Sequence, residues 1–278
     1  STGTTNCWRR RCGRSGWLLR KSLAIAAALI ATIYLAICGL LYWSQRAYLY
    51  YPVPRHAEVP SFVLKRGDAD VVVSTNGIDG PRAVLYFGGN AEDVSQVVAP
   101  LGRAFPGRSV YAMHYRGYGG SDGTPSEQAL VADAKRLFAQ VAAEHRGIVL
   151  VGRSLGSGIA IQVAAAHPAE RLVLVTPYDS IVELAADRFR LFPVALLLQD
   201  KYESGRYAPR IRVPTTLIVA TRDQVIPMAS SLRLAGRFAP GIARVVEFPE
   251  AGHNDVSSFP GYAEALAGSR TKGGLLPP

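Results

Sequence analysis

One long apolar run dominates the N-terminal part of the chain, where no charged residue occurs between Leu23 and Trp43. A helix of this length, with a rise of ~1.5 Å per residue, covers ~30 Å, which is the thickness of the hydrocarbon core of a bilayer. A cleaved signal peptide would have a shorter apolar region that ends in small residues. The pattern therefore predicts an uncleaved transmembrane anchor over residues 22–45, behind a basic leader over residues 1–21.

After the anchor, short apolar runs alternate with stretches of helical periodicity. The runs are mostly apolar throughout, which is typical of strands covered on both faces in a parallel sheet. Strands are predicted at 70–74, 83–87, 109–113, 148–151, 171–175, 215–220 and 243–248, and helices at 92–105, 126–144, 155–167 and 228–238. The alternation predicts an α/β fold, with a doubly wound and mostly parallel sheet, over residues 46–267.

The segment 178–212 interrupts this rhythm because it is too long for a simple turn between two strands. It contains two apolar clusters, Phe189 to Phe192 and Val194 to Leu198. Two interpretations stay open, a short lid or a single crossover helix with a ragged start, and the clusters suit either an acyl pocket or a buried core. The last residues, 268–278, are polar and rich in Gly and Pro, and we expect them to be disordered.

The net charge of +10 comes mainly from the N-terminal part of the chain. Eight of the 31 Lys and Arg residues precede Glu58, the first acidic residue, which leaves 23 basic against 21 acidic residues in the rest. The rest has no basic stripe with interleaved aromatic residues, so nucleic-acid binding is excluded. Because basic residues are more numerous before the anchor than just after it, we expect a cytoplasmic leader and an extracytoplasmic body, periplasmic in a bacterium.

The cysteines, Cys7, Cys12 and Cys38, all lie in the leader or the anchor. The body therefore needs no disulfide and suits an oxidising compartment. Two leader cysteines cannot complete a zinc shell, and the chain carries neither a phosphate loop nor a dinucleotide fingerprint. We predict no metal and no cofactor, and the sequence leaves the oligomeric state open.

The strongest chemical signal is Gly152-Arg153-Ser154-Leu155-Gly156, which stands between a predicted strand and a predicted helix. In such an elbow the serine occupies a strained strand-to-helix turn, and the flanking glycines let neighbouring backbone approach closely. The following helix points its N-terminus at the serine, where developing negative charge is favoured. This context predicts that Ser154 is a nucleophile.

A serine hydroxyl needs a base to remove its proton, and the base needs an acid to orient it. His253 and Asp223 each follow a predicted strand, at the edge of the sheet where ligands bind in open α/β folds. Both also come after Ser154 in the expected order of nucleophile, acid and base. The rivals are His114 as the base and Asp179 and Asp255 as the acid.

The transition state also needs two backbone N–H donors for its oxyanion. Leu155, directly after the nucleophile, supplies one of them. The loop Gly88-Gly89-Asn90 follows the strand predicted at 83–87, and Asn90 is our candidate for the second donor. The alternative is a tight Gly-Gly turn with no catalytic role.

Six separated motifs in this chain fall in one order. They are Gly-Gly-Asn-Ala-Glu-Asp at 88–93, Tyr-Arg-Gly-Tyr-Gly-Gly-Ser at 115–121, Thr-Pro-Ser-Glu at 124–127, the elbow, Thr-Arg-Asp at 221–223 and Gly-His-Asn-Asp at 252–255. From about Tyr48 to Tyr262 the chain resembles membrane-anchored α/β-hydrolases of the bud-emergence type, whose relatives include depalmitoylases and serine-aminopeptidase-like hydrolases.

The resemblance implies an α/β-hydrolase fold, a catalytic triad of Ser154, Asp223 and His253, and an oxyanion hole at Asn90 and Leu155. One position departs from the pattern, since Gly88 stands where such proteins usually carry His. The expected function is a serine hydrolase that cleaves acyl ester or thioester bonds of a small-molecule or lipid substrate at a membrane surface. The alternatives are a serine peptidase of the same fold and a non-catalytic, membrane-tethered interaction module.

Overall fold

A computed structural model of the chain describes residues 6–56, 58–65 and 68–268. The tail predicted to be disordered, 268–278, lies outside the described residues from position 269 onward, as do residues 1–5 of the leader. The chain divides into two compact units between Gln45 and Arg46.

The first unit consists of most of helix α1 (Asn6–Leu49). The stretch Trp17–Leu49 reaches a mean hydropathy of 2.5, and among the described residues α1 is the one helix long and apolar enough to cross a membrane. Its large apolar side chains, such as Leu35 and Leu40, are exposed. A surface of this kind is unfavourable in water and suits a membrane anchor.

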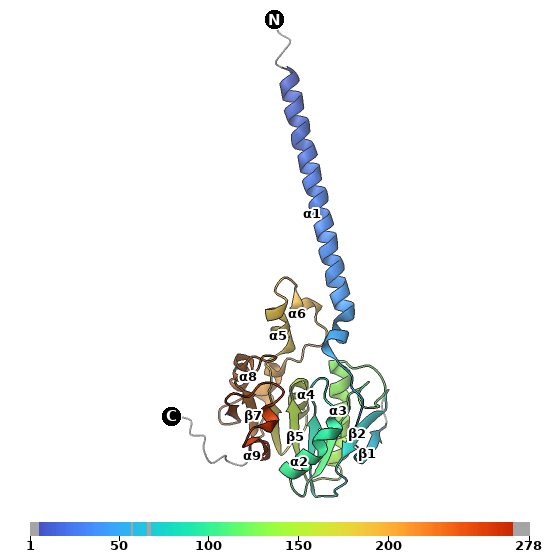
Figure 1. Cartoon of the computed structure of the whole chain (residues 1–278), viewed down its shortest axis with the longest axis vertical. Coiled ribbons are helices and arrows are strands. Elements are labelled where there is room, and N and C mark those ends of the chain that lie inside the picture. The colour runs from blue at the N-terminus through green and yellow to red at the C-terminus, as the bar shows by residue number, and fades with distance from the viewer. Residues whose placement is uncertain (1–5, 57, 66–67, 269–278) are drawn as a thin grey trace. The chain divides into compact units, whose positions relative to one another are not determined.

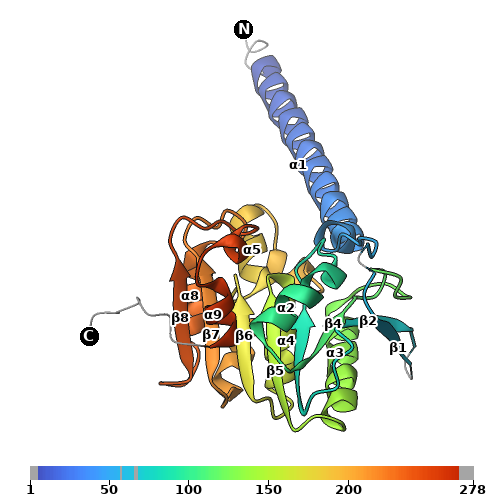
Figure 2. The same ribbon diagram turned by 60° about the horizontal axis from the view of Figure 1, so that its bottom comes forward.

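The second unit is built on one sheet of eight strands in the order β1-β2-β4-β3-β5-β6-β7-β8 (Figures 1 and 2). The strands are β1 (Ser61–Leu64), β2 (Val71–Thr75), β3 (Arg82–Phe87), β4 (Ser109–Met113), β5 (Gly147–Arg153), β6 (Arg171–Val175), β7 (Thr215–Ala220) and β8 (Ala243–Phe248). Strand β2 pairs antiparallel with both β1 and β4, and all other pairs are parallel. The predicted α/β fold with a mostly parallel sheet is confirmed.

Side chains of each central strand alternate between two apolar cores, one on each face of the sheet. In β3, Leu85 and Phe87 join the core beneath α3 (Glu127–Ala142), α4 (Leu155–Ala164) and α8 (Met228–Ala235). Val84 and Tyr86 join the opposite core with α2 (Val98–Ala104) and α9 (Tyr262–Ala267). Burial on both faces explains why these strands are apolar throughout.

Two expectations about the elements need correction. Strand β1 was not predicted, because it is a short edge strand with an apolar run of only three residues and with burial that alternates along it. The helix predicted at 92–105 begins later, as the 3₁₀ turn η1 (Val94–Val97) followed by α2, because Asp93 caps the turn by accepting from the N–H of Ser95. The helix predicted at 126–144 is present as α3, with Ser126 as its N-cap accepting from the N–H of Ala129.

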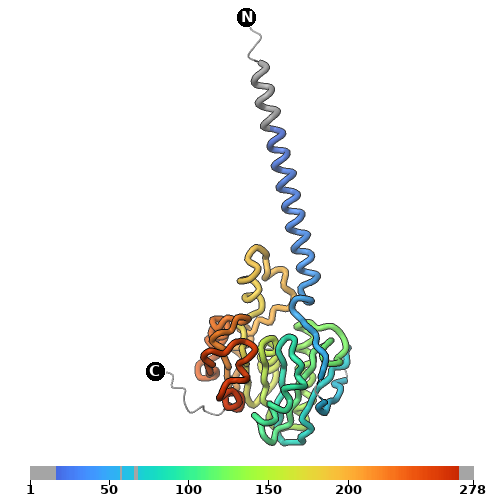
Figure 3. Tube along the Cα trace, viewed as in Figure 1, coloured from blue at the N-terminus to red at the C-terminus, as the bar shows by residue number. Residues whose placement is uncertain are grey.

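The segment 178–212 is not a single crossover helix. It holds α5 (Ile181–Arg188), α6 (Val194–Leu197), α7 (Ser204–Tyr207) and the 3₁₀ turn η2 (Ala208–Arg210). Helices α5 and α6 form a hairpin, residues 181–198, whose path leaves the body of the unit and returns to it (Figure 3). The apolar clusters in this hairpin are largely not core, since Val194 is its one fully buried side chain.

Candidate active site

Ser154 stands at the sharp turn between β5 and α4. Its backbone has φ 49° and ψ −118°, a left-handed conformation that is strained for any residue with a Cβ. The N–H of Ser154 donates to the carbonyl of Val175 at 2.9 Å, which helps to hold the turn against β6. A Cβ at Gly156 would collide with the carbonyl of Phe87, so this position requires glycine. Contacts with β6 and β3 thus hold the turn in its strained conformation.

The structure brings His253 and Asp223 to this serine from two separate loops. His253 Nε2 lies 2.9 Å from Ser154 Oγ, and His253 Nδ1 lies 2.7 Å from Asp223 Oδ2. The side chains of His253 and Asp223 are 9% and 2% exposed. The other carboxylate oxygen of Asp223 accepts from the N–H groups of Val225 and Ile226 at 2.8 and 2.7 Å. Both oxygens of the acid are therefore engaged, and its orientation is fixed.

The rival residues have other partners. Asp179 lies 3.5 Å from Arg237, and Asp255 accepts from the N–H of Gly252 in a local turn. His114 is buried against Ser74, with Nε2 2.9 Å from the serine hydroxyl. Burial lowers the pKa of His114 to about 4, so this imidazole is neutral near pH 7.

The oxyanion loop, residues 88–92, follows β3 and lies beside the nucleophile. A Cβ built on Gly89 would be 3.5 Å from Ser154 Cβ, which shows how closely the loop passes. Within the described part of the chain, the backbone N–H groups of Asn90 and Leu155 donate to no protein acceptor. Leu155 begins α4, so the positive end of that helix dipole also faces the serine. These two N–H groups are the oxyanion donors that were predicted from the sequence.

A partly buried ion pair that involves the oxyanion loop was not predicted. Glu92 accepts from the N–H of Gly89 at 2.5 Å, from Arg153 Nη1 at 3.1 Å and from the hydroxyl of Tyr86 at 2.7 Å. Burial lowers the pKa of Arg153, but the Glu92 carboxylate together with Tyr86 and Tyr262 more than offsets this, and the pKa is raised overall. Arg153 also reaches the carbonyl of His253 at 3.4 Å. The pair thus links the oxyanion loop, the elbow and the histidine loop.

Two tyrosines of the Tyr-Arg-Gly-Tyr motif hold the same loop from the side of β4. The buried Tyr115 donates to the carbonyl of Gly88 at 2.7 Å, and Tyr118 donates to Asn90 Oδ1 at 2.8 Å. Between them, Arg116 bonds Asp133 on α3 at 2.7 Å and so fixes the motif itself. This role of the tyrosines was not predicted from the sequence.

The side chain of Asn90 also ties the loop to the segment that enters the α/β unit. Its Nδ2 donates to the carbonyl of Leu49 at 2.8 Å, and its Oδ1 accepts from the N–H of Tyr51 at 2.9 Å. The main-chain N–H of Asn90 therefore remains available to the site, while its side chain bonds to the entering segment. No group of three His, Cys, Asp or Glu side chains suited to a metal comes together among the described residues.

Known proteins match this chain in both sequence and fold. The family described as serine aminopeptidase, S33 matches residues 81–197. An uncharacterised protein of Mycobacterium tuberculosis is 34% identical over 82% of this chain and 87% of its own length. The α/β-hydrolase domain-containing protein aho-3 of Caenorhabditis elegans is 32% identical over 66% of this chain and 55% of its own length. Protein bem46 of Schizosaccharomyces pombe is 24% identical over 72% and 71%.

The chain is a bem46-like member of the α/β-hydrolase superfamily. Solved structures agree with this fold. Est1E from Butyrivibrio proteoclasticus, determined with ferulic acid, superposes with a TM-score of 0.60 over 74% of this chain and 96% of its own, at 12% identity. A monoacylglycerol lipase of Paleococcus ferrophilus gives a TM-score of 0.54 over 71% and 98%, at 21% identity.

Gly88 stands where the resemblance led us to expect a histidine, and the structure shows what surrounds this position. A Cβ at Gly88 would collide with Val94 and would lie 3.3 Å from Glu92 Oε2. A histidine therefore does not fit here without a shift of Val94. In this hydrolase the loop is held by two hydrogen bonds: Glu92 accepts from the N–H of Gly89, and Tyr115 donates to the carbonyl of Gly88.

Proposed function

We propose that this α/β-hydrolase cleaves acyl ester or thioester bonds through an acyl-Ser154 intermediate. The observation that carries the proposal is the continuous hydrogen-bonded chain from Ser154 Oγ through His253 to Asp223, at 2.9 and 2.7 Å. A serine held in this way beside a base and an oriented acid is the arrangement that nucleophilic acyl transfer requires.

In the proposed mechanism, Ser154 Oγ attacks the acyl carbonyl carbon while His253 Nε2 takes the hydroxyl proton. The N–H groups of Asn90 and Leu155 stabilise the oxyanion that forms, and Asp223 stabilises the imidazolium. Collapse of the tetrahedral intermediate breaks the bond to the leaving group, which receives the proton from His253. Water then attacks the acyl-enzyme with His253 as the base, and release of the carboxylic acid restores Ser154.

We propose an apolar acyl chain as the substrate portion that the enzyme selects. A cavity of about 580 Å³ lies between α5 and residues 224–227, which directly follow Asp223 in the chain. Ile181, Leu184, Val225 and Pro227 are among its lining residues. Ligand sites are mostly apolar with a few placed polar groups, and this volume is in their usual range. The anchor helix would keep the enzyme at a membrane surface, where lipid acyl substrates are concentrated.

A chain-length series of p-nitrophenyl esters, assayed with matched thioester and amide analogues, tests the reaction class. We expect ester or thioester turnover with a preference for short or medium acyl chains, and labelling by a fluorophosphonate probe that Ser154→Ala abolishes. The absence of both labelling and turnover would favour the non-catalytic module. The serine peptidase is a second candidate, because the matching family is described as serine aminopeptidase; amide turnover without ester turnover would establish it.

We propose a cytoplasmic N-terminus and an extracytoplasmic hydrolase unit. The proposal rests on the excess of basic residues before the apolar run. A cysteine introduced at Ile78, an exposed position of the hydrolase unit, should react with an impermeant thiol reagent on intact spheroplasts. If this cysteine reacted only after lysis of the spheroplasts, the orientation would be the opposite of the one proposed.

A further inference from the structure

The hairpin of α5 and α6 carries the most exposed large apolar side chains of the described α/β unit. Leu191 and Leu196 are each 83% exposed, and Phe189 is 49% exposed. All three fall within residues 189–196, which we call the hairpin tip. A concentration of apolar surface at one protruding site differs from singly scattered apolar residues and indicates an interaction surface.

The base of the hairpin is firmly closed. The N–H of Ile181 donates to the carbonyl of Lys201 at 3.1 Å. Glu127 on α3 accepts from the N–H groups of Lys201 and Tyr202 at 2.7 and 2.9 Å. On the other side, Glu183 of α5 forms an ion pair with Arg233 of α8. The exposed tip is therefore attached to the unit through a base that hydrogen bonds and an ion pair hold in place.

The same base is bonded to the segment through which the chain enters the α/β unit. Asp200 accepts from Arg46 Nε at 2.8 Å, and the hydroxyls of Tyr202 and Tyr50 lie 2.9 Å apart in a buried pair. The base of the hairpin is therefore bonded to Arg46, the residue that directly follows the predicted anchor.

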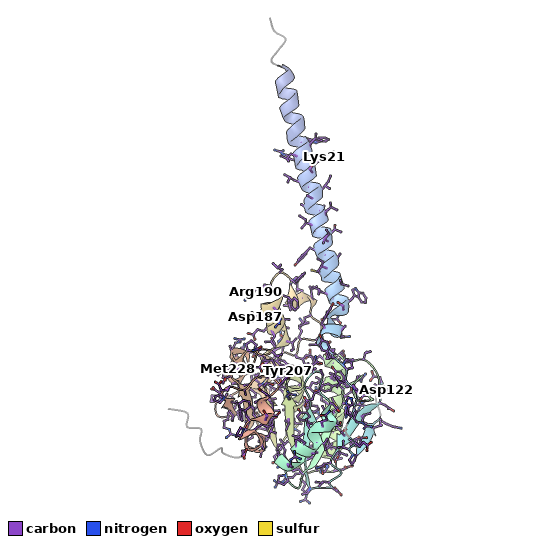
Figure 4. All side chains as sticks on the ribbon, in the orientation of Figure 1. Lys21, Asp122, Asp187, Arg190, Tyr207 and Met228 are labelled. Carbon is purple, nitrogen blue, oxygen red and sulfur yellow. The ribbon has the colours of Figure 1, made fainter. Side chains whose placement is uncertain are left out.

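The side chains around the hairpin match the interface of a bilayer. Arg188 and Arg190 are exposed beside the apolar tip, and Figure 4 labels Arg190 and Asp187 where the hairpin stands out from the unit. Tyr48 and Tyr51 are exposed in the entering segment. Figure 1 shows α5 and α6 at the end of the unit where this segment enters. Apolar side chains with flanking arginines and nearby tyrosines are typical of segments that lie in the headgroup region.

We propose that the hairpin tip, residues 189–196, enters the lipid interface of the bilayer that holds the anchor. The unit would then contact the membrane at two places, and the cavity beside α5 would lie next to the lipid. This contact goes beyond the proposed hydrolysis and does not depend on it. A second copy of the chain covering the tip is the competing occupant, and the test separates the two.

The test uses the full-length chain in vesicles of phosphatidylethanolamine and phosphatidylglycerol. Cys7, Cys12 and Cys38 are replaced by Ala, and one cysteine at Leu191 or Leu196 carries an environment-sensitive nitrobenzoxadiazole group. The matched control is the same label at Ile78, which is 46% exposed in the loop before β3, at the opposite edge of the sheet from the site. We expect spin-labelled lipids to quench the label at 191 and 196 at least threefold more than at 78. Equal quenching, or a blue-shifted label that lipids do not quench, would overturn the proposal.

A second variant gives an independent readout that rests on the proposed function. Leu191→Asp/Leu196→Asp should reduce hydrolysis of a lipid acyl ester in vesicles about tenfold and leave hydrolysis of a water-soluble short ester unchanged. Equal rates on the vesicle substrate for this variant and the parent would count against membrane contact. If the parent hydrolyses neither ester, the proposed function fails, and lipid quenching alone decides the hairpin proposal.

Discussion

The oxyanion loop and the hairpin are both loops that leave the carboxyl ends of strands, but they are held in opposite ways. Within the oxyanion loop Glu92 accepts from the N–H of Gly89, and from outside it Tyr115 and Tyr118 donate to Gly88 and Asn90. The hairpin is fixed only at its base, and α5 has no fully buried side chain. Groups that act on a transition state gain from preorganisation, whereas a surface that meets variable substrates does not need it. From this difference we expect the chemistry at the first region and the contact with lipid at the second.

The largest effect should come from breaking the chain of hydrogen bonds at the serine. Ser154→Ala and His253→Ala should each lower kcat/KM on an ester by at least about a thousandfold, because the oxyanion donors alone leave only residual catalysis. Asp223→Asn should be somewhat milder. Asp179→Asn is the matched control and should remain active, since Asp179 pairs with Arg237 instead. If Asp179→Asn were inactive and Asp223→Asn active, the assignment of the acid would be wrong.

The support of the oxyanion loop should also weaken in acid through His114, which directly precedes Tyr115. Its pKa in the folded chain is about 4, against an ordinary value of 6.5, chiefly because burial disfavours the charged ring; Asp93 opposes this shift and Arg55 adds to it. The unfolded chain therefore binds a proton between these pH values that the folded chain does not. Stability from this group is fully present above pH 6.5 and is lost as pH falls through 4.

We expect the free energy of unfolding to fall by about 2–3 kcal/mol between pH 7 and pH 4.5 from His114 alone. Urea unfolding of the detergent-solubilised chain at both pH values, followed by circular dichroism, measures the change. His114→Gln removes the titration and keeps a hydrogen-bonding group beside Ser74. An equally large pH dependence in this variant would show that other groups are responsible.

The ion pair that involves the oxyanion loop should have a smaller effect, on turnover more than on binding. Glu92→Gln weakens the bonds to Gly89 N–H and Arg153, so the loop should lose alignment with the transition state. We expect kcat to fall about ten- to a hundredfold with little change in KM. Glu170→Gln is the matched control, since Glu170 pairs with Arg108 away from the serine. Equal losses in both variants would indicate general destabilisation rather than positioning.

The fold was predicted correctly wherever burial produces a clear pattern of apolar residues along the sequence. Buried strands such as β6 and β7 are apolar throughout, and their bounds were predicted correctly. The edge strand β1 was missed because its apolar run is only three residues long and half of its side chains are exposed. Ser154, Asp223 and His253 could be proposed from their places after strands and their order along the chain.

The supports of the site could not be predicted in the same way. Glu92 bonds Arg153, which is far away in the sequence, and only the pairing of β3 with β5 brings them together. The helix predicted at 92–105 would have placed Glu92 in its first turn, with no role at the site. The two tyrosines at 115 and 118 were visible only as part of a motif, and their role follows from the packing of β4 against β3.

The smallest expected effect concerns the stability that the hairpin tip contributes. Leu191→Ser should change the free energy of unfolding by no more than about 0.5 kcal/mol, because a side chain that is 83% exposed loses little contact when it is shortened. Leu150→Ala, in the fully buried part of β5, should cost about 2–5 kcal/mol. Unfolding of both variants in detergent, followed by circular dichroism, makes the comparison. A loss above about 1 kcal/mol for Leu191→Ser would mean that the tip packs on the protein. Its exposure would then not serve lipid contact, and the contrast between a preorganised loop and an adaptable hairpin would fail.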